Sequence, residues 1–563
     1  MKGKNMNNVS KYKPSVVVDL PDRQWPNRVI TKAPIWCSVD LRDGNQSLAE
    51  PMDVEQKLEF FKTLVACGFK EIEVGFPASS DIEHQFLRRL IEENLIPDDV
   101  TIQVLVQARE DLIIKTVESL RGARRVIIHM YNSTSPVQRR VVFEMTKAQT
   151  VELAVRGAEW VKKYSAGLGA TEVLYQYSPE SFSATEVDFS VQICEAVMDV
   201  WQPTPEKKII LNLPNTVEVA MPNVYVDQVE WFCRHIGRRN SVVISVHSHN
   251  DRGTGVAATE QAMLAGAERV EGTLFGNGER TGNCDIITVA LNLYTQGIDP
   301  ELDFSNLDQI REVYERCTGM TVPARQPYSG DLVFTAFSGS HQDAIRKGLS
   351  YRELGDAVLC IVPHVDTEVW DVPYLVMDPN DVGREYKPIR VNGQSGKGGI
   401  AFLLETECHI NLPKAMLIEF GQIAGPQIDK LGREVTAGDL ETMFRGEYDR
   451  NGPYKLRCLQ VTEGPGGCNC VASVVRSSQP FSLAGEGNGP IDAFVNSLQA
   501  IIADDIRVVD QAEHALGGGA NACAISYVQL RFNDGITRWG SGIDTSIPQA
   551  SAKAVLSALN RKE

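Results

Sequence analysis

Short apolar runs alternate with longer amphipathic segments from residue 34 onward, and this rhythm dominates the first half of the chain. Each run has the length of a β-strand, and most are almost continuously apolar, as is typical of strands buried on both faces of a parallel sheet. The eight runs are Ile35–Asp40, Glu71–Val74, Ile102–Val106, Val126–Met130, Val173–Tyr177, Ile209–Leu213, Val242–Val246 and Val270–Phe275.

Segments with helical periodicity separate these runs. The segment Val54–Cys67, for example, carries apolar residues three and four positions apart and is followed by Gly68, a residue type that commonly ends helices. Eight strands that alternate with helices predict an α/β fold, a (β/α)8 TIM barrel over residues 34–304. A doubly wound sheet is the alternative, but no glycine fingerprint follows the first apolar run.

The rhythm ends near residue 300, and the rest of the chain has a different organisation. Residues 305–435 mix loops with short periodic segments and are expected to form linker subdomains. Two successive strand–strand–strand–helix patterns within 436–563 predict a pseudo-symmetric α+β (βββα)2 domain with a binding or regulatory role. Residues 1–33 begin with a polar, basic stretch and are expected to form an N-terminal arm, not a signal peptide.

Composition narrows the class of protein. Hydrophobic residues make up 43% of the chain and charged residues 23%, both ordinary values for a globular protein. The net charge of −17 disfavours non-specific nucleic-acid binding. The chain has no apolar run long enough to indicate a membrane span. The 12 cysteines are scattered, with Cys468 and Cys470 as the one close pair, which argues against a structural zinc site and favours a reducing, cytoplasmic location.

Polar residues at the strand ends are the candidates for chemistry, because a TIM barrel places its active site there. His247 and His249 are two positions apart on one strand, so both side chains point to the same side. Asp43 follows the first strand, and Asn283 follows the last. Two imidazoles, a carboxylate and an amide oxygen form a suitable site for a divalent metal. The alternative is a pair of core or surface histidines.

Further polar residues surround the same barrel mouth. Arg42 can stabilise developing negative charge beside a metal, or form a salt bridge with Asp40 or Glu180. Glu180 and Thr216 can orient a substrate, or cap loops. The remaining strand-end candidates for substrate contact are His129, Tyr131, Ser178 and Gln46.

Four sequence stretches together closely resemble the 2-isopropylmalate synthase family, in its longer-chain branch. They are DLRDGNQ at 40–46, HNDRGTGVA at 249–257, GTLFGNGERTGN at 272–283 and FSGSHQDAI at 337–345. The resemblance implies a Claisen-type condensation of acetyl-CoA with 3-methyl-2-oxobutanoate, which yields 2-isopropylmalate and CoA and commits carbon to leucine synthesis. It also implies a divalent metal, Mg²⁺ in the first place and otherwise Mn²⁺ or Zn²⁺.

The resemblance assigns roles to individual residues. Asp43, His247, His249 and Asn283 match the metal ligands, and Arg42 matches the residue that stabilises charge on the reacting oxygens. The substrate-contacting positions match His129, Ser178 and Thr216, to which Tyr131 and Gln46 are added from the strand ends. Glu180 matches a carboxylate near the reacting methyl group.

Residues outside the barrel complete the implied site. In this branch the linker supplies a histidine and a tyrosine to the partner subunit's barrel, and His341 and Tyr374 match them. His341 is the expected base, and a homodimer is implied. The C-terminal repeat resembles a leucine-binding regulatory domain, with Gly487, Gly489 and Asp544 as the candidate effector site.

Three alternatives stay open from the sequence. The first is a related acyltransferase that uses pyruvate or 2-oxoglutarate, since one methylene group changes binding by only about 1–3 kcal/mol. The second is a lyase or carboxyltransferase with the same barrel and metal, and the third is a catalytically silent leucine sensor. No carrier-lysine motif is visible, and none of the matching site residues is missing.

Overall fold

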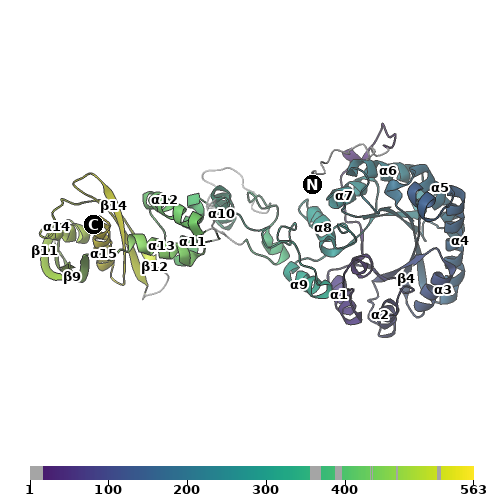
Figure 1. Cartoon of the computed structure of the whole chain (residues 1–563), viewed down its shortest axis with the longest axis horizontal. Coiled ribbons are helices and arrows are strands. Elements are labelled where there is room, and N and C mark those ends of the chain that lie inside the picture. The colour runs from purple at the N-terminus through teal and green to yellow at the C-terminus, as the bar shows by residue number, and fades with distance from the viewer. Residues whose placement is uncertain are drawn as a thin grey trace, which may run out of the picture. The chain divides into compact units, whose positions relative to one another are not determined.

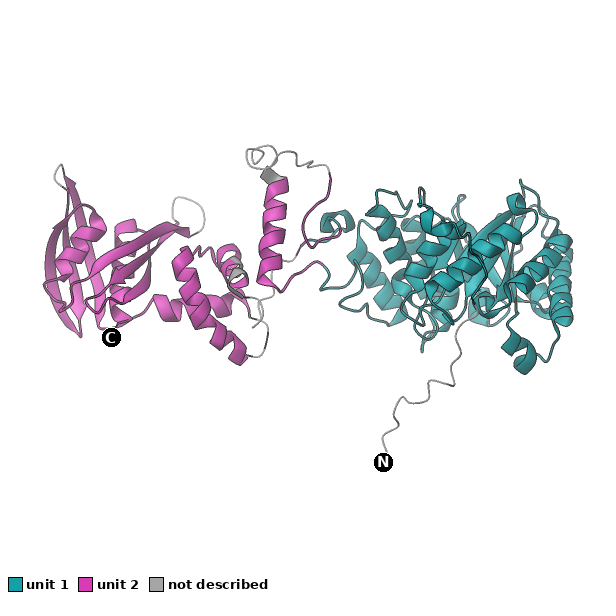
Figure 2. Ribbon diagram, turned by 90° about the horizontal axis from the view of Figure 1, so that it is seen from above, with its two compact units in different colours: residues 1–333, 377–385 teal, residues 334–376, 386–563 magenta. Residues whose placement is uncertain are grey.

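The computed structural model describes residues 17–354, 369–386, 396–431, 433, 435–464, 467–516 and 522–562. They belong to two compact units (Figure 2): Met1–Val333 with Met377–Glu385, and Phe334–Val376 with Tyr386–Glu563. Residues 1–16 of the expected N-terminal arm lie outside the described residues. Within the described part of the chain, no helix is long and apolar enough to cross a membrane.

Eight parallel strands close into a barrel in sequence order (Figure 1). They are β1 Ile35–Ser38, β2 Glu71–Gly75, β3 Thr101–Gln107, β4 Arg125–Ser133, β5 Glu172–Glu180, β6 Ile209–Asn215, β7 Val242–Ser248 and β8 Arg269–Gly272. Closure is visible at Cys37, which lies opposite Glu71 of β2 on one side and opposite Glu271 of β8 on the other. The predicted (β/α)8 barrel is therefore confirmed.

Eight helices follow the barrel strands and surround them (Figure 1). They are α1 Val54–Ala66, α2 Asp81–Glu92, α3 Glu110–Ser119, α4 Lys147–Ser165, α5 Val187–Trp201, α6 Pro222–His235, α7 Gly255–Ala265 and α8 Ile286–Tyr294. α1 begins with a reciprocal cap, in which Asp53 accepts from the Gln56 amide at 2.9 Å and Gln56 returns the bond to the Asp53 amide at 2.9 Å. Its apolar face, with Leu58, Phe61 and Leu64, is buried.

The structure differs from the sequence prediction at the end of the barrel. β8 ends at Gly272, although the apolar run continues to Phe275. Phe275 has a φ of 57°, in the left-handed region, and the Leu274 amide donates to the Asp40 carboxylate at 3.0 Å, not to a neighbouring strand. Helices α3 and α8 were not predicted. α8 is short and apolar at most positions, so few polar residues mark a solvent-exposed face in its sequence.

The described part of the N-terminal segment lies along α6. Arg23 binds the Asp227 carboxylate through two hydrogen bonds of 3.0 and 2.8 Å, and the Trp25 indole donates to the same group at 2.8 Å. The Gln24 amide donates to Glu230 at 3.0 Å. Both acceptors are buried, so this segment satisfies carboxylates that would otherwise be costly to bury.

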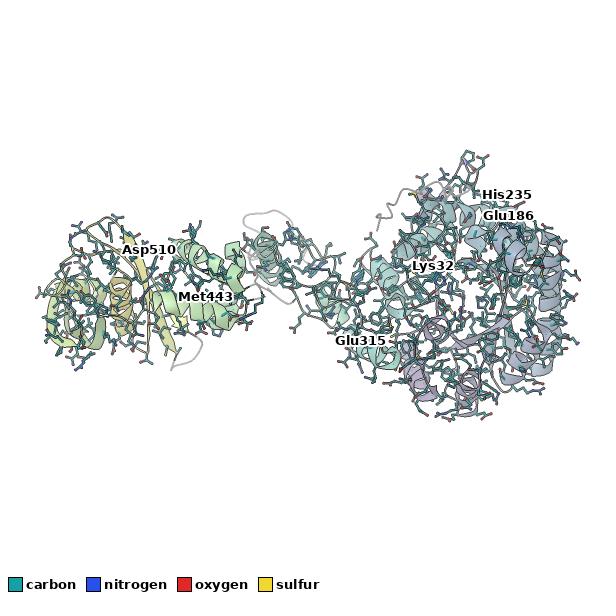
Figure 3. All side chains as sticks on the ribbon, viewed as in Figure 1. Lys32, Glu186, His235, Glu315, Met443 and Asp510 are labelled. Carbon is teal, nitrogen blue, oxygen red and sulfur yellow. The ribbon has the colours of Figure 1, made fainter. Side chains whose placement is uncertain are left out.

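The second unit begins with helices and ends with two sheets. Its helices are α10 Gly339–Leu354, α11 Gly396–Cys408, α12 Lys414–Leu431 and α13 Ala437–Tyr448, while α9 Leu307–Thr318 belongs to the first unit. Side chains of α11, α12 and α13 form one apolar cluster with Ile525, Tyr527 and Trp539. Met443, labelled on α13 in Figure 3, packs against this cluster.

The C-terminal residues form two consecutive βββα modules, as predicted. The first contains β9 Tyr454–Gly464, β10 Gly467–Arg476, β11 Gln479–Gly487 and α14 Pro490–Leu498. The second contains β12 Arg507–Leu516, β13 Cys523–Arg531, β14 Thr537–Asp544 and α15 Ile547–Asn560. Both sheets are antiparallel, and a shared apolar core contains residues of α14, α15 and both sheets.

Paired glycines bring each helix close to its sheet. A Cβ atom at Gly485 of the first module would lie 2.3 Å from the Ala493 carbonyl oxygen of α14. A Cβ atom at Gly542 of the second module would lie 2.3 Å from the Ala550 carbonyl oxygen of α15. Each module therefore needs glycine where the last strand contacts the helix backbone.

Candidate active site in the barrel

A cavity of about 320 Å³ opens at the carboxyl ends of the barrel strands. The barrel residues singled out by sequence line it, with the exception of Asn283. The lining residues are Arg42, Asp43, Gln46, Leu105, His129, Tyr131, Ser178, Glu180, Asn212, Pro214, Thr216, His247, His249, Glu279 and Arg280. The lining is mainly polar and charged, which suits a small polar ligand.

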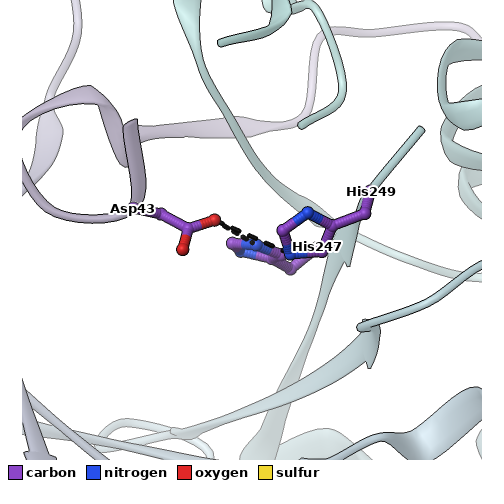
Figure 4. A group of neighbouring side chains, drawn as sticks. All are labelled: Asp43, His247 and His249. Atoms are coloured by element: carbon purple, nitrogen blue, oxygen red, sulfur yellow. Dashed lines mark ion pairs between the residues drawn. The ribbon is translucent and has the colours of Figure 1, made fainter. Parts of the chain in front are cut away.

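Asp43, His247 and His249 converge in this cavity (Figure 4). The Oδ2 atom of Asp43 lies 3.3 Å from Nε2 of His247 and 3.7 Å from Nε2 of His249. Three buried donors of carboxylate and imidazole type therefore face one point. This is the donor set that divalent metals of the Mg²⁺, Mn²⁺ and Zn²⁺ class accept.

Unpartnered acceptor atoms support the fit to a metal. Among the described residues, Asp43 Oδ2 and Asn283 Oδ1 are buried without a hydrogen-bond donor. The Asn283 amide nitrogen donates to the Asn277 carbonyl at 3.0 Å, and Asn283 pairs with His249 through an isolated β-bridge. Buried acceptors are normally satisfied, so these oxygens are suited to bind a cation.

Local backbone geometry positions Asp43. The chain leaves β1 through a wide turn at Asp40–Gly44, where the Asp43 and Gly44 amides both donate to the Val39 carbonyl, at 2.9 and 3.1 Å. Asp40 accepts from Leu274 of the last loop, so the first and last loops of the barrel are tied together. Single turns of this π type are frequent at functional sites.

The electrostatics differ among the three converging groups. Burial raises the pKa of Asp43, but Arg42 and His247 outweigh it and hold that pKa well below the usual range. Burial also lowers the pKa of His247, yet the neighbouring carboxylates of Asp43 and Glu271 raise it to about 9. Burial and the neighbouring His247 lower the pKa of His249 to about 4. Between these two pKa values, the two histidines therefore carry one positive charge, on His247.

Arg42 and His129 are held by one buried carboxylate. Glu73 accepts from Nε of Arg42 and lies 2.7 Å from Nδ1 of His129. Arg42 also donates to Asp43 at 2.7 Å. The other imidazole nitrogen of His129 lies 2.7 Å from the Ser178 hydroxyl.

The remaining barrel residues border the cavity at different places. Tyr131 accepts from Gln107 at 2.9 Å, and Gln46 donates to Glu279 at 3.3 Å. Glu180 accepts from the Ser133 hydroxyl. Thr216 accepts from the Ser181 amide at 2.9 Å.

His341 and Tyr374 belong to the second unit, and the structure brings them together. Their rings stack with centroids 3.9 Å apart and planes inclined by 18°. Tyr374 has a φ of 65° and an exposed side chain. A non-glycine residue in the left-handed region is strained, and such strain often marks functional positions.

The three candidate effector residues lie at the turns before α14 and α15. A Cβ atom at Gly487 would lie 2.4 Å from the Ala493 amide, whereas the position at Gly489 is open. Asp544 accepts from the Ser546 amide at 3.0 Å and pairs with Lys553 at 2.8 Å. The carboxylate therefore holds the turn before α15.

Comparison with protein families divides the chain into three consecutive parts. The HMGL-like family model matches residues 33–313. The model for the alpha-isopropylmalate synthase post-catalytic domain matches residues 331–405, and that for the LeuA allosteric (dimerisation) domain matches residues 434–563.

Relatives that align with nearly the whole chain identify its family. The 2-isopropylmalate synthases of Pseudomonas entomophila and Pseudomonas syringae pathovar tomato are each 54% identical to the chain. Each alignment covers 98% of this chain and 97% of the relative. The chain belongs to the 2-isopropylmalate synthase family.

Solved structures similar to this 2-isopropylmalate synthase family member match about half of its length. Hydroxymethylglutaryl-CoA lyase from Pseudomonas aeruginosa is 17% identical, with a TM-score of 0.43, and covers 53% of this chain and 97% of its own. HMG-CoA lyase from Brucella melitensis is 16% identical, with a TM-score of 0.41, and covers 51% of this chain and 100% of its own.

Several residues of the site were missed by the sequence analysis. Glu279, Arg280 and Asn212 line the cavity, and Glu73 and Glu271 lie directly beneath it. The available signal was a buried charge within an apolar strand, as at Glu73 in EIEVG and Glu271 in RVEG. Alternation along the strand places such a side chain inside the barrel.

Proposed function

We propose that this member of the 2-isopropylmalate synthase family condenses acetyl-CoA with 3-methyl-2-oxobutanoate, giving 2-isopropylmalate and CoA. The observation that carries the proposal is the convergence of Asp43, His247 and His249 in a cavity that also contains Arg42 and His129. A catalytically silent sensor would have no need for this set of buried charged groups.

The proposed metal ligands are Asp43, His247, His249 and Asn283. We propose Mg²⁺ as the ion, with Mn²⁺ and Zn²⁺ as ions that the same donors accept. A bound divalent ion supplies Lewis acidity toward the ketone of the oxo acid. The unpartnered oxygens of Asp43 and Asn283 support this assignment.

The proposed oxo-acid contacts surround the ligand set. Arg42, fixed by Glu73 and Asp43, is oriented to stabilise negative charge on the reacting oxygens. His129 and Ser178 form a hydrogen-bonded pair beside it. Tyr131, Thr216 and Gln46 complete the proposed substrate-binding set.

The condensation needs a base for the weakly acidic methyl group of acetyl-CoA. We propose His341 of the partner subunit, with Tyr374 stacked on it and Glu180 near the reacting methyl group. The base removes a methyl proton, the methyl carbon attacks the ketone carbon, and the ketone oxygen takes up a proton. Water then cleaves the thioester and releases CoA. Both the homodimer and the cytoplasmic location are parts of this proposal.

The cavity mouth favours a monocarboxylic oxo acid over 2-oxoglutarate. The cavity lining contains one further cation, Arg280, which lies in the GTLFGNGERTGN stretch. Its guanidinium donates to Asp251 at 2.7 and 3.1 Å and to the Thr216 carbonyl. Its charge is therefore compensated, and it offers little to a second substrate carboxylate.

CoA release, followed with a thiol reagent, tests the proposed reaction. The assay uses acetyl-CoA with 3-methyl-2-oxobutanoate, pyruvate or 2-oxoglutarate, each with and without EDTA. We expect release that requires metal and is fastest with 3-methyl-2-oxobutanoate. Faster release with another oxo acid would replace the substrate, and no release from metal-loaded protein would overturn the condensation.

A further inference from the structure

A layer of fully buried polar side chains lies directly beneath the cavity. It contains Glu73 of β2, Gln103 of β3, Gln176 of β5, and Arg269 and Glu271 of β8. Barrel interiors are usually filled by branched apolar side chains. Burying charge is unfavourable unless every group is paired, so a layer of this kind needs a function.

Glu271 connects this layer to a candidate metal ligand. One carboxylate oxygen lies 2.9 Å from Nδ1 of His247 and accepts from Asn212 at 3.2 Å. The other oxygen accepts from Arg269 and from Gln176, each at 2.7 Å. With Nδ1–H of His247 donated to Glu271, Nε2 is the nitrogen that faces Asp43 and the ligand position, and its lone pair can bind a metal ion that displaces the Nε2 proton.

Glu73 plays the corresponding part for the oxo-acid side of the cavity. One oxygen accepts from Arg42, and the other lies 2.7 Å from Nδ1 of His129. This arrangement fixes Nε2 of His129 toward Ser178 and the cavity. Glu73 thus orients the two side chains to which the proposed function gives oxo-acid contacts.

Gln103 joins the two carboxylates. Its amide nitrogen donates to Glu73 and, at 3.2 Å, to Glu271. Its amide oxygen accepts from Arg269 at 2.9 Å, so the orientation of the amide is defined. Gln176 is the useful contrast, because it is equally buried and donates to Glu271, but within the described part of the chain it makes no hydrogen bond to Glu73.

We propose that Glu271 and Glu73 are positioning residues for two halves of the site, and that Gln103 ties the halves together. Glu271 sets the metal half through His247, and Glu73 sets the oxo-acid half through Arg42 and His129. The assignment of the second half rests on the proposed function. The metal half rests on the side-chain geometry alone.

Binding measurements on Glu271→Gln and Glu73→Gln test the two halves separately. The probes are Mn²⁺, followed by the loss of its free electron paramagnetic resonance signal, and 3-methyl-2-oxobutanoate, followed by calorimetry at saturating Mn²⁺ without acetyl-CoA. In Glu271→Gln, the side chains of Arg269, Gln176 and Gln103 still donate to the remaining carbonyl oxygen. The new NH₂ group therefore faces Nδ1 of His247. His247 then carries its proton on Nε2, where the metal binds.

We expect Glu271→Gln to weaken Mn²⁺ binding by about 10- to 100-fold. At saturating Mn²⁺, its affinity for the oxo acid should stay within about threefold of the wild-type value, since Glu73 is intact. Glu73→Gln should show the reverse pattern, with near-wild-type Mn²⁺ affinity and oxo-acid binding weakened by about tenfold or more. Equal losses of both affinities in both variants would overturn the division into halves.

Gln103→Met and Gln176→Met test whether Gln103 couples the two halves of the site. Both substitutions are uncharged and similar in size to glutamine. We expect Gln176→Met to weaken Mn²⁺ binding by a few-fold and to leave oxo-acid binding unchanged. Gln103→Met should weaken both. Identical behaviour of the two variants would overturn the role of Gln103, and this comparison remains decisive if Glu271→Gln does not fold.

The wild-type protein separates this proposal from the proposed function. If it binds Mn²⁺ but not 3-methyl-2-oxobutanoate, the proposed substrate is wrong, and the Mn²⁺ measurements still decide the role of Glu271. If wild type binds both and the variants match it, the positioning proposal is wrong and the proposed function stands.

Discussion

The barrel interior and the C-terminal modules solve the problem of close packing in opposite ways. Beneath the barrel cavity, charged and amide side chains such as Glu73, Glu271 and Arg269 fill the interior and satisfy one another. Between sheets and helices of the modules, the core is apolar, and glycine allows the backbones to touch.

This difference indicates which property of each region a substitution should change first. In the barrel, each buried charge depends on specific partners, so a substitution should change chemistry and titration before it changes the fold. In the modules, backbone contact leaves no space for a side chain, so a substitution should change stability first. The predictions below test this contrast.

The largest expected effect is the loss of activity in Asp43→Asn. The substitution removes a proposed carboxylate ligand of the metal and the ion pair with Arg42. We expect CoA release to fall on the order of 1,000-fold, since a metal contributes several kcal/mol to charge stabilisation. The melting temperature should change little. The control is Asp98→Asn, which changes an 89% exposed side chain in the loop before β3 and should leave activity unchanged.

A second effect concerns the pH dependence of barrel stability. Burial raises the pKa of Asp40 to about 7, from an unfolded value of 3.8. Between these values, the folded carboxyl keeps a proton that the unfolded chain loses, so stability falls as the pH rises. Relative to Asp40→Asn, wild type should lose roughly 3 kcal/mol between about pH 5 and about pH 8. Chemical denaturation at both pH values measures this difference, and parallel curves would contradict it.

The sequence predicted the residues that converge in the cavity better than the buried residues that hold them in place. Strand-end position and the His-X-His spacing identified the three converging residues without any contact information. The sequence analysis did not identify Glu271, because its proposed positioning role depends on hydrogen bonds from five different strands, from Gln103 on β3 to Arg269 on β8. Such pairing is a property of the closed barrel, and local periodicity does not encode it.

The prediction of helices and strands was limited in the same way, to features encoded by local periodicity. Most of the barrel helices and both βββα modules were predicted because their periodicity is local. The end of β8 was placed wrongly, since a distant carboxylate, Asp40, takes the Leu274 amide out of the strand ladder. The stacking of His341 on Tyr374 also joins residues from separate segments, and nothing in either segment alone indicates it.

A smaller effect is expected for a single methyl group in the second module. In Gly542→Ala, the new Cβ atom would lie 2.3 Å from the Ala550 carbonyl oxygen and 2.6 Å from the Ala554 amide. We expect a loss of about 1–3 kcal/mol in the stability of the C-terminal unit, measured by calorimetry. Gly446→Ala is the control in the same unit, because that position of α13 is open and alanine favours a helix, so it should not lower stability. Equal losses would contradict the close-contact explanation.

The smallest expected effect links the second module to regulation. Asp544 holds the turn before α15 through Ser546 and Lys553, at the proposed leucine site. In Asp544→Asn, we expect the leucine concentration for half-inhibition of CoA release to rise about tenfold, with activity in the absence of leucine unchanged. Asp534→Asn makes the same charge change in the turn between β13 and β14 and should leave inhibition as in wild type. If millimolar leucine does not inhibit the wild-type protein, the regulatory proposal is wrong and the modules have only a structural role.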